Sequence, residues 1–253
     1  MEIWIDTTDL TEIETALQTG VVDGITMDWK LIPPKFVINP RPFAKEVLAL
    51  IKRHKPDTHL DVGGVFFKKP NQTLGFARMI EETFNYKHLT VQIPIGFYEL
   101  AVIRELAQNK MSVNCVACMD VNQGILAAKA GAKYVSFFWN YIRDGIKEKE
   151  TEIIDSSTES EKKFEFQKEI DKINEKRSMD GNDFNPEFVV GTFFQLSEHH
   201  KWPIKTIAHS IEGLIDVRDA ALVRANIIVL PLSLLKNMPE HFMTEMVIEA
   251  TRD

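Results

Sequence analysis

Short apolar segments alternate with longer amphipathic segments along most of the chain, and this alternation is the strongest constraint on the fold. β-Branched runs such as Leu89–Ile93 predict buried strands, whereas Phe97–Gln108 and Asn122–Ala130 carry apolar residues at helical spacing. Strands that alternate with helices are typical of βαβ units, which build a parallel sheet. We count eight candidate strands, near Ile3–Asp6, Gly24–Thr26, His59–Gly63, Leu89–Ile93, Ser112–Ala117, Tyr134–Phe138, Thr206–Ala208 and Ile227–Leu230.

Strand and helix repeated eight times favour a closed barrel over an open sheet. One (β/α)8 barrel typically takes about 250 residues, and this chain has 253. We therefore predict an α/β fold, a single (β/α)8 TIM barrel that spans residues 1–253. No Gly-x-Gly-x-x-Gly fingerprint follows any predicted strand. Nothing in the sequence therefore supports a nucleotide, and we expect no cofactor.

Ile146–Asn185 differs from the rest of the chain because it is dense in Glu, Lys, Asp and Ser. Such stretches form solvated helices or loops. Phe164, Phe166 and Ile170 recur at roughly helical spacing, whereas Met179–Asp183 is typical of a loop. We interpret residues 146–185 as a charged insertion that enlarges the sixth βα unit. The alternative is a lid over the barrel mouth.

Composition excludes several classes of protein. The formal net charge is −7 and no basic stripe is visible, which argues against nucleic acid as a partner. No apolar run reaches roughly 18 residues, so we expect no membrane span, and the N-terminus lacks the basic region of a signal peptide. Cys115 and Cys118 fall in one predicted strand. Because residues three apart on a strand point to opposite faces, we expect two separate buried thiols in a cytoplasmic protein.

Four segments, in order along the chain, carry a resemblance to a known family. They are Met1–Asp9, Asp23–Trp29, Gln123–Val135 and Val229–Leu232. Together they resemble the transaldolase family, in particular its small fructose-6-phosphate-aldolase-like branch. The resemblance implies a TIM barrel that acts in carbohydrate metabolism. In this family a three-carbon unit is transferred from a ketose phosphate in the pentose phosphate pathway.

The same resemblance bears on partners. It implies a small polar, sugar-like ligand and leaves a homo-oligomer as a possible assembly. Pro239–Thr251 is the last helical pattern, and the chain ends soon after it. We therefore do not expect the extended C-terminal helix that interlocks subunits in the aldolase-like branch.

The sequence departs from the family pattern at functional positions. The family carries a Schiff-base lysine on its fourth strand, where this chain has Gln92, and an amide nitrogen is not nucleophilic. Asp28 stands in place of an asparagine, and Tyr141 in place of an arginine. The phosphate motif of the seventh strand reads Ser210-Ile211-Glu212, and a glutamate there repels a phosphate dianion.

Function in a barrel is located at the carboxyl ends of the strands. As catalytic candidates we select Asp6 for proton transfer, Gln92 for orienting hydroxyls or carbonyls, and His209 as a general base or a pocket-wall residue. The candidates for substrate binding share a predicted strand-end position. They are Thr26, Asp28, Asp61, Asn114, Asn140, Arg143, Ser210 and Glu212.

Three functions remain open. The first is an aldolase-like enzyme that acts on a small sugar or keto compound without a Schiff base at position 92. The second is a catalytically inactive homologue that binds a small polar ligand or a protein. The third is a metal-dependent lyase or isomerase, because Asp6, Asp28 and Asp61 come from successive strands and carboxylates repel unless a cation or proton intervenes. No tight ligand spacing supports that metal site, so we expect no bound metal.

Overall fold

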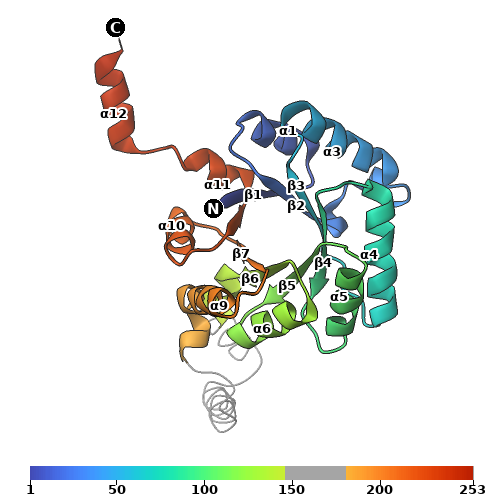
Figure 1. The fold of residues 1–253 in the computed structure, drawn as a ribbon. Coiled ribbons are helices and arrows are strands. Elements are labelled where there is room, and N and C mark those ends of the chain that lie inside the picture. Colours follow the sequence, from blue (N-terminus) through green and yellow to red (C-terminus); the bar gives the residue numbers. More distant parts are fainter. Residues whose placement is uncertain (146–180, 253) are drawn as a thin grey trace, which may run out of the picture.

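Eight parallel strands close into a barrel in the computed structural model, which describes residues 1–145 and 181–252 (Figure 1). Each strand pairs with its neighbours in sequence, and β1 closes the ring by pairing with β8. The strands are β1 (Glu2–Asp6), β2 (Gly24–Asp28), β3 (His59–Gly63), β4 (Leu89–Pro94), β5 (Val113–Cys118), β6 (Tyr134–Phe138), β7 (Lys205–His209) and β8 (Ile227–Leu230). The predicted fold class is confirmed, and all eight predicted strands are present.

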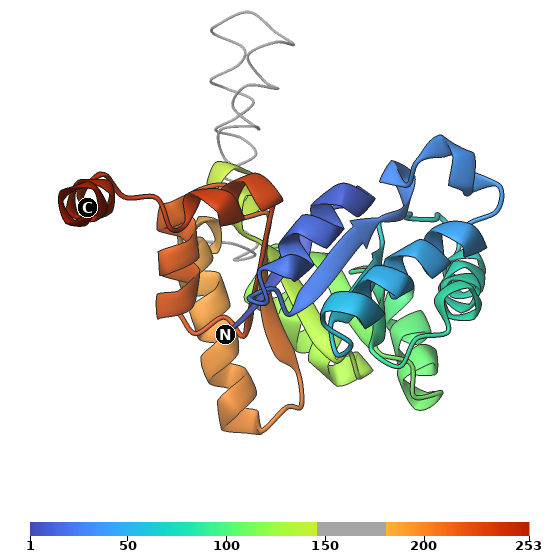
Figure 2. The same cartoon turned by 90° about the horizontal axis from the view of Figure 1, so that it is seen from above.

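Except for the last one, α12, the described helices lie around the outer face of this barrel (Figure 2). The helices are α1 (Leu10–Gln18), η1 (Trp29–Leu31), α2 (Pro34–Val37), α3 (Arg41–His54), α4 (Pro70–Phe84), α5 (Glu99–Gln108), α6 (Val121–Ala130), η2 (Gly181–Phe184), α9 (Pro186–His200), α10 (Leu214–Leu222), α11 (Leu232–Asn237) and α12 (Phe242–Thr251). Residues 139–145 are also helical. Among the described residues, no helix combines the length and apolarity that a membrane span requires.

Side-chain caps fix where several helices begin. Asp9 accepts hydrogen bonds from the backbone N–H groups of Thr11 and Glu12 at the start of α1, and Asp120 caps α6 through the N–H of Gln123. These carboxylates satisfy backbone donors that have no partner within the helix. Because each cap follows a strand closely, the caps also set where each strand-end loop stops.

The apolar core has two parts. The larger lies between the outward faces of the strands and the helices, and includes Ile25, Val62 and Phe193. The smaller consists of Trp4, Tyr134, Ile207, Ile227 and Val229, all almost fully buried. Strand side chains alternate between the two faces of the sheet, so this second group fills the barrel interior. Polar side chains occupy the part of the interior that is nearer the carboxyl ends of the strands.

The charged insertion is described only at its end. Residues 146–180, and with them the predicted amphipathic helix around Phe164, lie outside the described residues. Of the loop predicted at Met179–Asp183, the described part, Gly181–Asp183, belongs instead to the short 3-10 helix η2. Asn185, which we placed at the end of the insertion, caps α9 by accepting a hydrogen bond from the N–H of Phe188.

The geometry expected for the two cysteines is wrong. The pairing of β5 with β6 shifts register between Cys115 and Cys118, and Ala117 has a left-handed φ of 60°. This bulge removes the strict two-residue alternation of the strand. The two Sγ atoms are therefore 3.9 Å apart rather than on opposite faces, although both thiols are free and buried.

The helical pattern predicted at Pro239–Thr251 is present as α12 (Phe242–Thr251), but its placement differs from the expectation that the chain has no extended C-terminal helix. Helix α12 extends from the body of the barrel beyond α11, as two perpendicular views show (Figures 1 and 2). None of its residues is buried. Its exposed apolar side chains are Phe242, Met243, Met246, Val247 and Ile248.

Candidate functional site

A hydrogen-bonded network of five side chains crosses the interior of the barrel from β2 to β6. Thr26 Oγ1 donates to Asp61 Oδ2 at 3.1 Å, and Gln92 Nε2 lies 2.8 Å from Thr26 Oγ1 and 2.9 Å from Asp61 Oδ2. Asn114 Nδ2 donates to the same Asp61 oxygen at 2.9 Å, and Ser136 Oγ donates to Asn114 Oδ1 at 3.0 Å. We call these five residues the interior polar network.

Asp61 is the centre of this network and its hydrogen bonds are unequally shared. Its Oδ2 atom receives three hydrogen bonds, whereas Oδ1 is buried without a partner among the described residues. The residue is 1% exposed. Burial raises the pKa of Asp61 to about 6 even though bonds from Asn114, Gln92 and Thr26 lower it. The geometry leaves Oδ1 as the atom that binds a proton or an added donor.

Asp6 and Asp28 lie at the carboxyl ends of β1 and β2, which belong to the barrel mouth, meaning the strand ends and the loops that follow them. Asp28 accepts a hydrogen bond from the Lys30 backbone N–H and so caps η1. Asp6 as a residue is exposed to solvent. Nevertheless, burial of its carboxyl group, together with the charge of Asp28, raises the pKa of Asp6 to about 6. The charges of Asp6 and Asp28 are therefore close enough to interact.

His209 ends β7 and stacks on Phe138, the last residue of β6, with ring centroids 4.8 Å apart. Its Nδ1 is 3.2 Å from Ser210 Oγ, and Ser210 adopts a left-handed φ of 61°. Burial lowers the pKa of His209 to about 4. An imidazole of such low basicity is neutral near pH 7, which favours the pocket-wall role over that of a general base.

Three other predicted residues follow β6 and β7. Asn140 is 4% exposed, and neither polar atom of its side chain has a partner among the described residues. Arg143 Nη1 lies 2.6 Å from Asp216 Oδ1, and Asp216 also accepts from the backbone N–H of Gly213. The guanidinium is therefore held by a carboxylate that caps α10. Glu212 is exposed.

Residues 3–253 match the family described as transaldolase/fructose-6-phosphate aldolase. The chain belongs to this family. A protein from Chelativorans sp. (strain BNC1) named "Probable transaldolase" is 25% identical over 250 residues, which are 99% of this chain and 94% of the relative. A "Probable transaldolase" from Thermoplasma volcanium is 28% identical, over 97% of this chain and 91% of the relative.

Solved structures share the fold with this transaldolase/fructose-6-phosphate aldolase family member. One described as "Native KDPGal structure" has a TM-score of 0.51 at 13% identity and covers 91% of this chain and 82% of its own. A designed cube-shaped, porous protein cage built by fusing symmetric oligomeric domains has a TM-score of 0.53 at 12% identity, over 100% of this chain and 76% of its own. Sequence identities this low support a shared fold and say nothing about a shared function.

Lysine side chains are the alternative nucleophiles of this family member. Within the eight described strands the one lysine is Lys205, which begins β7 at the amino end and bonds to Glu2 at 2.7 Å. Lys30, close to the mouth, places its ammonium 5.6 Å from the centroid of the Phe66 ring. Among the described residues, the interior polar network therefore has no lysine within it.

The metal hypothesis gains no support from the geometry. Asp6, Asp28 and Asp61 are close enough to affect one another's charge. However, the described part of the chain has no group of three or more His, Cys, Asp or Glu that could hold a metal ion. We therefore do not carry the metal-dependent lyase or isomerase further.

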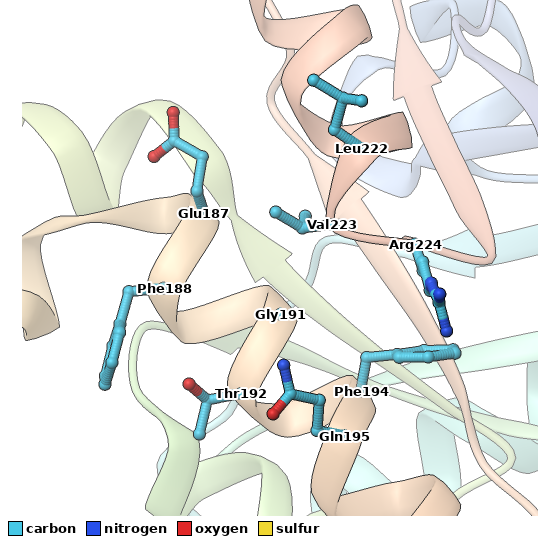
Figure 3. Close-up of a pocket in the computed structure, with 9 residues that line it drawn as sticks. All are labelled: Glu187, Phe188, Gly191, Thr192, Phe194, Gln195, Leu222, Val223 and Arg224. Atoms are coloured by element: carbon cyan, nitrogen blue, oxygen red, sulfur yellow. The ribbon is translucent and has the colours of Figure 1, made fainter.

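A hollow of about 560 Å³ lies outside the barrel, between α9 and the end of α10 (Figure 3). Its lining includes Phe188, Phe194 and Leu222 with the charged residues Glu187 and Arg224. None of the predicted site residues lines it. It is separate from the strand ends, where the fold locates function.

The structure joins four of the predicted residues into one network: Thr26, Asp61, Gln92 and Asn114. The other candidates lie at strand ends without hydrogen bonds to that network in the described residues: Asp6, Asp28 and His209 end β1, β2 and β7, and Asn140, Ser210 and Glu212 follow β6 and β7. Ser136 is the member that sequence reasoning missed. It lies two residues before Phe138 on β6, so strand alternation was the available signal.

Proposed function

We propose that this transaldolase/fructose-6-phosphate aldolase family member binds a small sugar-like keto or polyhydroxy compound at its barrel mouth and forms no Schiff base at position 92. The interior polar network carries the proposal. The Gln92 amide donates to Thr26 and Asp61 at the place where the resemblance implies a lysine. A locked amide can orient hydroxyl or carbonyl groups, whereas Schiff-base formation needs an unprotonated amine.

The unpaired polar atoms near the strand ends support binding of such a ligand. Asn140 has both a donor and an acceptor without partners, and Asp61 Oδ1 is similarly free among the described residues. A buried polar atom without a partner costs about 1–3 kcal/mol, so a ligand rich in hydroxyl groups gains by meeting these atoms. Asn140 and Asp61 are thus the residues we assign to ligand binding first.

A second candidate, transaldolase-type turnover, is favoured by the family and by Asp6. The names of the relatives suggest a transaldolase reaction, which the family resemblance assigns to the pentose phosphate pathway. The pKa of Asp6, raised to about 6 by burial and Asp28, suits proton transfer near neutral pH. In this alternative Asp6 moves the proton and the amine comes from a lysine elsewhere in the chain.

Borohydride trapping separates the two candidates. The protein is treated with dihydroxyacetone or fructose 6-phosphate and sodium borohydride, and intact mass is measured, with a lysine-bearing family member labelled in parallel. We expect no covalent adduct on this chain. A stoichiometric adduct mapped to one peptide would overturn the proposal in favour of turnover through a relocated lysine.

Ligand binding is measured separately, by the shift in melting temperature with dihydroxyacetone and with fructose. We expect a shift for the wild-type protein and a smaller one for Asn140→Leu, because the isosteric side chain cannot hydrogen-bond. The affinity loss is about threefold to tenfold for one or two hydrogen bonds. Absence of any shift in the wild-type protein contradicts the binding function.

A further inference from the structure

The two cysteines of the chain lie side by side near the carboxyl end of β5. Cys115 Sγ and Cys118 Sγ are 3.9 Å apart, and Cys118 Sγ is also 3.9 Å from the backbone oxygen of Cys115. Both thiols are free, and both side chains are buried in the larger apolar core. Because the chain has two cysteines in all, any disulfide within one chain joins these two residues.

A local distortion of β5 produces this contact. Between Cys115 and Cys118 the pairing of β5 with β6 shifts register, so that Cys118 lies opposite Phe137. Ala117 adopts a left-handed φ of 60°, a conformation that is strained for a residue with a Cβ atom. Residues three apart on a regular strand point to opposite faces. The strained bulge therefore holds the two sulfur atoms on the same side of the sheet.

The spacing and the contact distance both suit a disulfide. Bonded sulfur atoms are about 2.05 Å apart, so the Sγ atoms of Cys115 and Cys118 have to approach each other by roughly 2 Å. A movement of this size is within the reach of side-chain rotation combined with a small change in the bulge. Two residues between the cysteines is also the spacing of redox-active Cys-x-x-Cys motifs.

We propose that Cys115 and Cys118 form a reversible disulfide when the protein meets a hydroperoxide, and that this bond weakens the interior polar network through Asn114. Asn114 directly precedes Cys115 on β5. It donates to Asp61 Oδ2 at 2.9 Å and accepts from Ser136 Oγ at 3.0 Å. A movement of the strand at Cys115 draws the Asn114 amide away from Asp61. This proposal is independent of the proposed binding function.

The reaction balances with one hydroperoxide for each disulfide. One cysteine, as its thiolate, attacks a peroxide oxygen, the O–O bond breaks, and a sulfenic acid and water or an alcohol are formed. The second sulfur attacks the sulfenic sulfur, the S–S bond forms and water leaves. Each sulfur loses one electron, the hydroperoxide gains two, and both thiol protons end in the released products.

The buried position of the thiols sets how fast this reaction runs. Burial, with smaller contributions from Cys115 and Asp120, raises the pKa of Cys118, and only the thiolate is nucleophilic. The peroxide also has to reach the sulfur atoms through local opening of the β5 end. We therefore expect slow oxidation at neutral pH, and a faster reaction as the pH rises at constant peroxide concentration.

Peptide mass measures formation of the disulfide directly. The protein is treated with hydrogen peroxide, the peroxide is removed with catalase, and the unfolded protein is alkylated and digested with trypsin. Peptide Met111–Lys129 contains both cysteines. In the untreated protein it should carry two alkyl groups. After oxidation it should carry none and lack two hydrogen atoms, and dithiothreitol given before alkylation should restore both alkyl groups.

The variants Cys115→Ala and Cys118→Ala are matched controls, because each keeps one thiol and cannot form the bond within the chain. Their peptides should gain oxygen atoms at most and never lose two hydrogen atoms. The double variant Cys115→Ala/Cys118→Ala reports any effect of methionine oxidation under the same treatment. Circular dichroism confirms that each variant is folded.

The effect on the interior polar network is measured by urea denaturation at pH 4 and pH 7. The bond from Asn114 lowers the pKa of the buried Asp61 carboxyl group, whereas burial and the charge of Asp6 raise it. Losing that bond raises the folded-state pKa further, so oxidised protein should lose more stability between these pH values than reduced protein. Asp61→Asn should lose equally little in both redox states.

Each outcome bears on one part of the proposal. If the wild-type peptide keeps both alkyl groups even at alkaline pH, or gains oxygen atoms irreversibly without losing two hydrogen atoms, the disulfide is wrong. If the disulfide forms but oxidised and reduced proteins show the same pH dependence of stability, the link to the interior polar network is wrong. A difference that the double variant shows to the same extent after peroxide treatment also overturns that link.

Discussion

At the scale of single residues, Gln92 and Asp61 are coupled, because a change at either side chain alters the environment of the other. Gln92 Nε2 is 2.9 Å from Asp61 Oδ2, and both belong to adjacent strands of the barrel. A neutral amide stabilises the buried carboxylate by donating to it without adding a charge. A cation at position 92 would instead form a buried ion pair, which changes the protonation state of both groups.

This pairing predicts that restoring a lysine at position 92 does not by itself restore a nucleophile. In Gln92→Lys the carboxylate of Asp61 holds the new ammonium protonated, so borohydride with dihydroxyacetone should give little adduct. In Gln92→Lys/Asp61→Asn that charge is gone, and labelling should rise about tenfold for each unit by which the lysine pKa falls. Intact mass measures both, with Asp61→Asn as the control. Full labelling of Gln92→Lys alone contradicts this account.

Asp61 also predicts how stability depends on pH. Burial raises its pKa from 3.8 to about 6 in the folded protein, so the folded state binds the proton more tightly than the unfolded state. The free energy of unfolding should therefore fall as pH rises from about 4 to about 6, by at most about 3 kcal/mol from this group. In Asp61→Asn, which mimics the protonated acid, this decrease should be absent.

Urea denaturation at pH 4 and pH 8 measures the effect. The wild-type protein should lose more stability between these pH values than Asp61→Asn does. Asp57→Asn, at an exposed position before β3, is the control for removal of one aspartate. Equal pH dependence in wild type and Asp61→Asn is the result that contradicts the prediction.

At the scale of secondary-structure elements, α12 is exceptional because every one of its residues is exposed in the described part of the structure. Isolated helices of about ten residues are marginal in water, and the apolar side chains of α12 are exposed. A helix of this composition is stabilised when another surface covers it. We expect that surface to belong to a second copy of the chain, in a homo-oligomer.

Multi-angle light scattering tests this expectation. The wild-type protein should have a mass that is a multiple of 29.0 kDa. Met246→Glu should shift the distribution towards the monomer, because a charged side chain is costly to bury in an apolar interface. Leu126→Glu, on the exposed side of α6, is the matched control and should leave the assembly unchanged. A monomeric wild-type protein contradicts the expectation.

At the scale of the whole molecule, closure of the barrel depends on how its interior is filled. Trp4 is fully buried, stacks on His59 with centroids 5.6 Å apart and contacts the edge of Tyr134. Gly24 lies opposite Trp4 in the β1–β2 register, and a Cβ atom there would come within 2.5 Å of the indole ring. The glycine is thus required by the size of the tryptophan.

Gly24→Ala should destabilise the fold by about 1–3 kcal/mol, the usual cost of overpacking a core. The control is Gly75→Ala in α4, where an added Cβ meets nothing within 4 Å. Because glycine is a poor helix former, this second change should stabilise the protein by about 0.5–1 kcal/mol. Urea denaturation gives both values. A Gly24→Ala protein as stable as wild type would show that the interior can expand.

The sequence by itself determined the number and order of the strands and their alternation with helices. Periodicities of two and 3.6 residues can be recognised within one short segment, so they identify strands and helices without knowledge of the fold. Repetition of strand and helix then predicts a parallel barrel, whose functional residues lie at the carboxyl ends of the strands. That reasoning found Thr26, Asp61, Gln92 and Asn114 as site candidates.

Only the tertiary structure decided which of these side chains meet. Asp61 and Asn114 are 53 positions apart, and their contact depends on the register between strands, which no local pattern specifies. The bulge that brings Cys115 close to Cys118, and the exposure of α12, were likewise not predicted from the sequence. Both depend on how distant segments pack, so the sequence pattern of each segment could not reveal them.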